Sequence, residues 1–368
     1  MASPLAQWGN DLYTGKRSYD IIGHRRRWYI ASAVLLTVSV VLLVLQGLNP
    51  SIDFRGGAEF TVTGVERTEQ QPGIDAVAAV VPEDVPRVSV VGGNSIRVQT
   101  GDLTDEQTGQ VADALAMGYD VPASEVSSSF VGPNWGADVT GKALRGLVIF
   151  LLLVTIVMTI YFRAWRMAAA ALVALAHDLI ITVGLYAGIG WEVSPATVIG
   201  FLTILGYSLY DTVVVFDKVR ENTEKVLDQR RYTYAELANL AVNQTLVRSI
   251  NTSVVALLPV TAILFIGAFL LGAGTLRDIA LALFLGMIVG TFSSIFIATP
   301  FEVTLREREP AIAEHSKAVL AARRAATGSE VLTMDPVPVH VGAPVPGTHL
   351  GTKAQPKRRK PNRPTGKA

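Results

Sequence analysis

The chain has 368 residues, with 32 Lys and Arg against 31 Asp and Glu, and it contains no cysteine. Half of its residues are hydrophobic and only 17% are charged, which is below the roughly 25% of typical soluble domains. This composition excludes a disordered or collagen-like chain. The lack of cysteine excludes disulfides, thiol catalysis and cysteine-based zinc sites. The distribution of apolar residues must therefore decide the class of protein.

Apolar residues are concentrated in six long runs. As a helix, each run is long enough to cross a hydrocarbon core of roughly 30 Å, and six are too many for the buried helices of one soluble domain. Backbone groups in lipid need internal hydrogen-bond partners, so uninterrupted apolar runs predict helices and not barrel strands. The runs are 28–48, 144–162, 167–190, 196–216, 249–273 and 279–300. The sequence therefore predicts a polytopic α-helical membrane protein.

Positive charges predict the orientation, because Lys and Arg near span ends collect on the cytoplasmic side. Residues 1–27 carry five cations, 217–244 five and 303–368 twelve, whereas 49–142 carries five cations and fourteen acids. We expect the first three segments in the cytoplasm, so that both termini lie inside, and the fourth outside. The run 28–48 is then an uncleaved first span, and 143–302 holds spans two to six.

The outer segment 49–142 has the pattern of a small α+β domain. Alternating residues predict four strands, and helical spacing predicts two helices. Thr104 followed by Gln107 is a capping-box start. The strands are expected at 58–63, 87–91, 95–99 and 125–131, and the helices at 74–81 and 104–117. The order β-α-β-β-α-β, with a hairpin turn at 91–94, predicts a ferredoxin-like unit.

The tail divides into two parts of different composition. Residues 303–327 are rich in Ala, Arg and Glu and are expected to continue the last helix into the cytoplasm. Residues 333–368 are rich in Pro and Gly, contain the basic cluster 357–360 and are expected to be disordered. That cluster either binds anionic lipid or ribosomal RNA, or is a solvated tail.

Motifs of soluble enzymes are nearly absent. Residues 136–142 match G-x4-G-K, but Ala143 stands where a nucleotide-binding loop needs Ser or Thr to hold magnesium. Neither H-E-x-x-H nor G-x-S-x-G occurs. We therefore expect no catalytic residue, no metal site and no cofactor.

Ionisable residues inside the apolar runs are the strongest functional signal, because a charge at mid-depth costs about 2.5–3.5 kcal/mol on insertion scales. His177 and Asp178 lie at the centre of the third run, Asp211 lies in the inner half of the fourth, and Arg248 opens the fifth. A desolvated carboxylate beside a movable cation is suited to carrying a proton. The alternatives are structural: a snorkelling Arg248, a hydrogen-bonded His177 and Asp178, or a fixed pair of Asp211 with Arg248.

Helical spacing groups these residues with other polar side chains. We expect one polar face on the fourth run and one on the fifth, and both should point into the bundle and not into lipid. Six glycines should allow helices to pack closely and slide. The first face comprises Thr203, Tyr207, Ser208 and Asp211, the second Arg248, Asn251 and Thr252, and the glycines are Gly184, Gly188, Gly200, Gly206, Gly286 and Gly290.

Several motifs resemble the SecF branch of the SecD/SecF family of protein-export membrane proteins, over roughly residues 20–302. They are Asp-Phe-Arg-Gly-Gly at 53–57, His-Asp at 177–178, the segment 206–217 followed by Arg-Glu-Asn at 220–222, and the segments 244–249 and 293–296. The resemblance implies a member of the resistance-nodulation-division superfamily that pairs with SecD into a twelve-helix assembly. It also implies association with the SecYEG channel and use of the proton-motive force after the SecA motor has started transport.

The resemblance also implies roles for individual residues. Asp211 matches the proton-relay aspartate of the family and Arg248 its partner arginine, whereas Tyr210 replaces the usual Asn. A second tier, for relay or structure, comprises His177, Asp178, Tyr207 and Ser208. The junction between the first span and the outer domain is expected at Phe54, Gly56 and Gly57, where glycines allow a tight turn; the alternative is a plain strand start.

We therefore expect a non-enzymatic translocase subunit in the bacterial plasma membrane. Its expected partners are SecD, the SecYEG channel, unfolded preprotein, membrane lipids and, indirectly, SecA, with no specific nucleic acid. One alternative is half of a proton-driven exporter of lipids or small molecules from the same superfamily, although such chains usually carry twelve spans and two larger outer domains. A second is a non-transporting scaffold, which would need no charges at mid-membrane.

Overall fold

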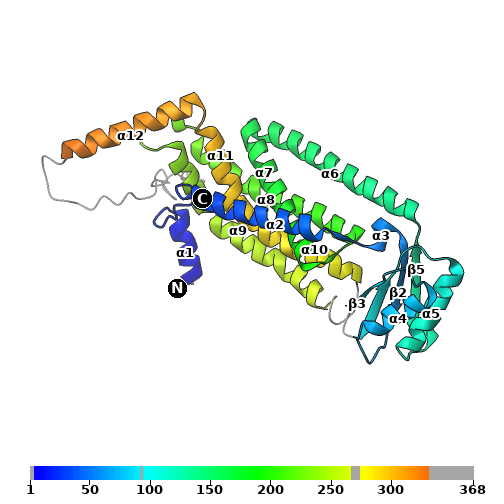
Figure 1. The fold of residues 1–368 in the computed structure, drawn as a ribbon. Helices are drawn as coiled ribbons and strands as arrows, with labels where there is room; N and C mark the ends of the chain where they lie inside the picture. The colour runs from blue at the N-terminus through cyan, green and yellow to red at the C-terminus, as the bar shows by residue number, and fades with distance from the viewer. Residues whose placement is uncertain (1–3, 92–93, 267–273, 331–368) are drawn as a thin grey trace, which may run out of the picture.

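The structure is a computed structural model that describes residues 4–91, 94–266 and 274–330. Within these residues, six helical segments are long and apolar enough to cross a membrane, so the predicted polytopic α-helical class is confirmed. The spans are α2 (Arg25–Gln46), α6 (Pro133–Phe162), α7 (Trp165–Ile189), α8 (Pro195–Thr223), α9 (Tyr234–Phe265) and a sixth that begins with α10 (Gly274–Ser293). The α+β domain lies at one end of the bundle, and α1 (Pro4–Tyr13) and α12 (Pro310–Glu330) lie at the other (Figure 1).

The sixth span changes helix type in its middle. α10 passes directly into a π-helical turn, η4 (Ser294–Ala298), and then into α11 (Thr299–Arg306). Such turns are rare and are frequently found at functional sites. The expectation that residues 303–327 continue this helix is wrong, because the chain turns at 307–309 and α12 begins separately at Pro310. Proline suits the first turn of a helix, where its missing N–H is not needed.

Glycines bring the central helices into close contact, as predicted. A Cβ atom added to Gly184 would lie 2.3 Å from Ser39 of α2, and one added to Gly286 would lie 2.2 Å from Ile204 of α8. Gly188, Gly200 and Gly290 are similarly close to Leu42, Ala282 and Ser208. Gly206 is the exception, because nothing lies within 4 Å of its Cβ position.

The α+β domain has the predicted order of elements. It comprises β2 (Gly57–Val62), α4 (Gln71–Val80), β3 (Arg87–Val91), β4 (Ser95–Gln99), α5 (Asp105–Gly118) and β5 (Val126–Val131), with the one-turn helix η1 (Ala123–Glu125) before β5. The strand order is β3-β4-β2-β5, and every neighbouring pair is antiparallel. This is the connectivity of a split β-α-β unit. The turn expected at 91–94 includes residues outside the described ones.

The core of this domain comes from alternating strand residues and one face of each helix. Its fully buried members include Phe60, Val77, Ile96, Val98 and Leu115. α5 starts with the predicted capping box: the Thr104 hydroxyl accepts from the Gln107 amide at 3.2 Å, and the Gln107 side chain accepts from the Thr104 amide at 2.9 Å.

Short elements connect the domain to the bundle. Between α2 and β2 lie β1 (Asn49–Pro50) and α3 (Ile52–Arg55), and between α7 and α8 lies β6 (Glu192–Val193). β1 and β6 pair in parallel. At the opposite end, α8 and α9 extend into the segment expected as a loop, so that only the one-turn helix η2 (Val226–Asp228) and its flanks separate them. The charged side chains of this segment can be solvated at the ends of α8 and α9, so they do not prevent these helices from extending.

We expect residues 57–131 to fold alone as a soluble domain, because their core lies within this segment. Thr104→Ala removes the acceptor for the first turn of α5 and should lower the free energy of unfolding by about 1 kcal/mol. Urea unfolding followed by circular dichroism measures this change, with Thr68→Ala, an exposed loop residue, as the control. A fragment without a cooperative transition would contradict the prediction.

Candidate functional site

The buried polar groups of the bundle converge on two carboxylates, Asp178 of α7 and Asp211 of α8. Asp178 is 1% exposed and Asp211 is 5% exposed. The Oδ2 atom of Asp178 accepts hydrogen bonds from the hydroxyls of Ser208 at 2.6 Å and Ser293 at 2.8 Å. Asp178 is thereby held by both α8 and the sixth span.

Asp211 is held by hydroxyls from two other directions. Its Oδ1 atom accepts from Ser249 of α9 at 2.7 Å, and its Oδ2 atom accepts from Ser294 of η4 at 2.5 Å. Ser293 and Ser294 are neighbours in the chain, and each binds a different aspartate. The change from α10 to the π turn therefore lies where the two carboxylates meet the sixth span.

His177 extends the first of these clusters. Its Nδ1 atom lies 3.0 Å from Oδ1 of Asp178, and its side chain is buried. Its Nε2 atom is also buried and has no hydrogen-bond partner within the described residues. The structure thus brings His177 and Ser208 of the predicted second tier into contact with Asp178.

The partners of Asp211 are chemically suited to a carboxylate that changes its protonation state. A serine hydroxyl both donates and accepts, and it rotates to suit its partner. The same two serines can therefore donate to a carboxylate and, after protonation of one oxygen, accept from a carboxylic acid. A group held in this way can gain or lose a proton without leaving an unsatisfied polar neighbour.

Arg248 does not lie beside Asp211, in contrast to the expected contact. Arg248 is exposed, and the described ion pairs do not include one between it and Asp211. Ser249 points at Asp211 instead. Consecutive residues on a helix are about 100° apart, so Arg248 lies on a different face of α9 from Ser249.

The predicted inward face of α9 is therefore wrong. Arg248 and Asn251 are exposed and Thr252 is half-buried, whereas the buried polar face is formed by Thr245, Ser249 and Ser253. These three follow the four-residue spacing of one helix face. α9 thus has polar side chains on two faces, and one of them is uncovered in this chain.

Other polar residues of α8 differ in exposure: some are partly buried in the bundle and others are exposed. Tyr207 is half-buried, and its hydroxyl donates to Ser253 at 3.4 Å. Thr203 is exposed, and Tyr210 is 54% exposed. The substitution Tyr210 does not alter the direct hydrogen bonds of Asp211, because both come from serines on other helices.

The predicted junction is closely packed. Gly56 and Gly57 have φ values of +80° and +121°, in a region that favours glycine. A Cβ atom on Gly57 would lie 2.3 Å from the Thr100 carbonyl oxygen, and one on Gly136 of α6 would lie 2.4 Å from the carbonyl oxygen of Phe54 in α3. Glycine is therefore needed here for approach of the backbones as well as for the turn.

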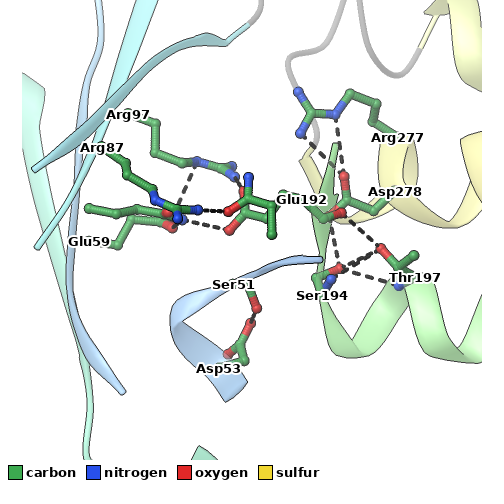
Figure 2. A network of polar contacts seen from close by, with 12 residues as sticks. Ser51, Asp53, Glu59, Arg87, Arg97, Glu192, Ser194, Thr197, Arg277 and Asp278 are labelled. Carbon is green, nitrogen blue, oxygen red and sulfur yellow. Dashed lines mark hydrogen bonds and ion pairs between the residues drawn. The ribbon is translucent and has the colours of Figure 1, made fainter. Parts of the chain in front are cut away.

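A polar network beside this junction links the domain to the bundle (Figure 2). Glu192 of β6 accepts from Gln99 at 2.6 Å and from Arg97 at 3.1 Å, both on β4. Both donors also bind Glu59 of β2, at 2.9 and 3.4 Å. Sequence reasoning missed Glu192, since nothing local distinguishes it from an ordinary loop acid.

The same network continues to the start of the span that carries Asp211. Ser194 is the N-cap of α8 in a capping box with Thr197, and its hydroxyl donates to Asp278 of α10 at 2.9 Å. Arg277 pairs with Asp278 at 3.2 Å. The outer domain, α8 and α10 are thus joined through polar contacts within a few residues of each other (Figure 2). The described residues contain no cluster of three His, Asp or Glu able to hold a metal ion.

Comparison with known proteins identifies the family. Residues 111–308 match the family described as "Protein export membrane protein SecD/SecF, C-terminal", and residues 41–63 match "SecD/SecF GG Motif", a range that contains Gly56 and Gly57. The chain belongs to the SecD/SecF family. The protein translocase subunit SecF of Streptomyces coelicolor is 47% identical over 87% of this chain and 86% of that protein. The SecF subunit of Mycobacterium tuberculosis strain H37Rv is 41% identical over 88% and 76%.

Solved SecDF structures support the same assignment. The crystal structure of SecDF from Thermus thermophilus, described as a translocon-associated membrane protein, has a TM-score of 0.67 and 32% identity, covering 79% of this chain and 39% of that chain. SecDF in its super-membrane-facing form gives 0.54 and 30%, covering 82% and 40%. The chain therefore spans about two fifths of these SecDF chains. It is a multi-pass membrane protein with a role in Sec protein export.

Glu192→Ala should loosen the domain on the bundle, because the two donors on β4 lose their acceptor on β6. The cysteine-free chain permits spin labels at Met117→Cys in the domain and Ile189→Cys in the bundle, both exposed positions. Double electron–electron resonance should show a broader distance distribution for Glu192→Ala. Glu83→Ala, an exposed acid of the same domain, is the control, and equal widths for both variants would refute the link.

Proposed function

We propose that this chain, together with SecD, couples the proton-motive force to late steps of protein export through the SecYEG channel. The supporting observation is Asp211, a buried carboxylate inside the spans that accepts hydrogen bonds from hydroxyls of two other helices. A charge at this depth is costly and tends to mark a functional site. In this proposal, Asp211 gains and loses the proton, and the chain has no hydrolytic chemistry of its own.

The two ends of the bundle differ in a way that fits this direction of transport. The α+β domain lies at one end, and α1 and α12 lie at the other (Figure 1). Cations are concentrated in the segments at the second end, which favours the cytoplasm. We therefore assign both termini to the cytoplasmic side of the bacterial plasma membrane and the domain to the outer side, where it would meet unfolded preprotein after SecA has started transport.

Protonation of Asp211 would act on helix packing. Hydrogen bonds to an ionised carboxylate are shorter and stronger than those to a neutral group. Both bonds of Asp211 cross helix boundaries, to Ser249 of α9 and to Ser294 of η4. A proton on Asp211 therefore weakens two interhelical contacts at once and favours a different position of α8.

A shift of α8 has a direct route to the outer domain. α8 begins at its cap residue Ser194, two residues after Glu192, and Glu192 binds β4 of the domain. The helix and the domain are therefore mechanically connected by one short strand, β6. In this proposal the domain moves as a body when the proton state of Asp211 changes.

The uncovered polar face of α8 and α9 is where we place SecD. Arg248, Asn251, Thr203 and Tyr210 are exposed on these two packed helices. Facing lipid, the unpaired charge of Arg248 would be costly wherever its side chain cannot reach the membrane surface. This chain spans about two fifths of the SecDF chains. We therefore expect helices of SecD to pack against this exposed polar face. In the assembly, Arg248 would bind an acceptor on SecD and not Asp211 of its own chain.

Asp211→Asn should abolish proton-dependent export while leaving the protein inserted and bound to SecD, because the amide keeps the shape but cannot carry the proton. Membrane vesicles energised by a proton gradient provide the measurement. Asp217→Asn, which removes an exposed carboxylate from the same helix, should export normally. Normal export by Asp211→Asn would refute the relay role.

Arg248 variants separate a paired arginine from a snorkelling one. If the arginine only snorkels, Lys serves equally well, since its stem is long and its charge is retained. If it binds across to SecD, Arg248→Lys should impair export and Arg248→Met should nearly abolish it, with less SecD copurified. Arg145→Met, at an exposed arginine of α6, is the control. Full export by both Arg248 variants would return the residue to a snorkelling role.

A further inference from the structure

We propose that Glu302 of α11 is a second proton-carrying carboxylate, which passes the proton from the level of Asp211 toward the end of the bundle opposite the α+β domain. The proposal rests on the proposed function of Asp211. It adds a residue that lies just beyond the last apolar run and that neither composition nor motif indicates. α11 lies at the end of the bundle from which α12 departs (Figure 1).

Glu302 is buried to an unusual degree for a carboxylate. Both Glu302 and Tyr234 of α9 are 0% exposed. The Tyr234 hydroxyl donates a hydrogen bond to Oε1 of Glu302 at 2.6 Å. The other oxygen, Oε2, is buried and has no hydrogen-bond partner within the described residues. Buried carboxylates ordinarily have partners on both oxygens, so Oε2 is the position at which a proton can be held.

The neighbouring charges do not form a full ion pair with Glu302. The closest cation is Arg306, whose Nε atom is 3.8 Å from Oε1. Arg306 donates instead to Glu309 at 2.6 Å, and Arg166 of α7 pairs with the same Glu309 at 2.7 Å. Both arginines are thus engaged by Glu309, which leaves Glu302 with one long contact.

These groups are the charged and titratable side chains that face Glu302 from the elements packed around it. Tyr234 comes from α9, Arg306 from its own helix, Glu309 from the following turn, and Arg166 from α7 through Glu309. Within the described contacts, α8 and η4 contribute none. A buried charge is costly unless it is well paired, and a proton on Oε2 removes that charge.

Buried hydroxyls lie on the segment between Glu302 and the site of Asp211. Ser294, which donates to Asp211, lies eight residues before Glu302, roughly 12 Å along the helix axis. Between them, the Thr299 hydroxyl donates to the Ser294 carbonyl at 3.3 Å. Ser294, Thr299 and Glu302 are each 0% exposed. Two buried hydroxyls, those of Ser294 and Thr299, thus lie on the segment between the two carboxylates.

Beyond Glu302 the surroundings become accessible to water. The side chains of Arg306 and Glu309 are 28% and 20% exposed. Glu302 is therefore a fully buried carboxylate one helical turn before partly solvated charges. This is where a proton moving away from Asp211 would be held before release.

Glu302→Gln tests the assignment, because glutamine keeps the shape and an acceptor for Tyr234 but cannot carry the proton. The complex with SecD, reconstituted in proteoliposomes, is given a proton gradient, and proton flux is followed with a pH-sensitive dye. We expect loss of flux in Glu302→Gln and partial recovery in Glu302→Asp, which restores the acid. Glu307→Gln removes a partly exposed carboxylate that pairs with Arg25 at 2.7 Å on the same side of the bundle, and it should retain flux.

Infrared difference spectra provide a readout that a structural role would not change. A protonated-carboxyl band that titrates in the parent protein should be missing from Glu302→Gln and present in Glu307→Gln. An unchanged band, or no recovery with Asp, would overturn the proposal. If Glu302→Gln does not assemble, Tyr234→Phe removes the hydrogen bond to Oε1, and a flux with unchanged pH dependence on that side would overturn it as well.

Asp211→Asn, measured in parallel, separates the two proposals. Flux lost in Asp211→Asn but retained in Glu302→Gln would overturn the role of Glu302 alone. Flux retained in both variants would overturn the proposed function together with this inference. Flux lost in both, with recovery by Asp and loss of the carboxyl band, supports both roles.

Discussion

The hydrogen bonds that hold Asp211 between three helices are the interaction on which the rest of the bundle depends. A carboxylate inside the spans needs partners for both oxygens, and here they come from Ser249 and Ser294. To bring these hydroxyls within reach, α8 must pack closely on α9 and on the sixth span. Gly286 and Gly290 permit this approach, since added Cβ atoms would lie 2.2 Å from Ile204 and 3.0 Å from Ser208. The glycines thus permit the close helix packing that the hydrogen bonds of Asp211 require.

Much of the fold could be predicted because its signals are local. Long apolar runs indicate spans, alternation indicates strands, and Thr104 with Gln107 indicates a helix start, and each of these was confirmed by the structure. The inward face of α9 could not be predicted, because Arg248, Ser249, Asn251 and Thr252 place polar groups all around one turn. Only the neighbouring helices decide which of them is buried, and they select Ser249.

The missed site residues depend on contacts between distant segments. Glu302 follows Pro300, where the apolar run ends, and with Arg306 four residues later it has the spacing of an ordinary surface pair. Its full burial comes from packing against α9, which the sequence does not show. Ser293 and Ser294 were visible as a motif, but the binding of each to a different aspartate depends on the placement of the π turn between α10 and α11.

The position of the π turn suggests why the sixth span is built from three pieces. An α-helix turns about 100° per residue, and the wider π turn changes this phase. Ser294 can then face Asp211 while Thr299 and Glu302, further along, remain inside the bundle. In a helix of uniform type from Gly274 to Arg306, the residues after position 298 would face a different direction. The irregular turn therefore lies between the contact to Asp211 and the buried Glu302 on the same span, and a shift of η4 would act on both carboxylates.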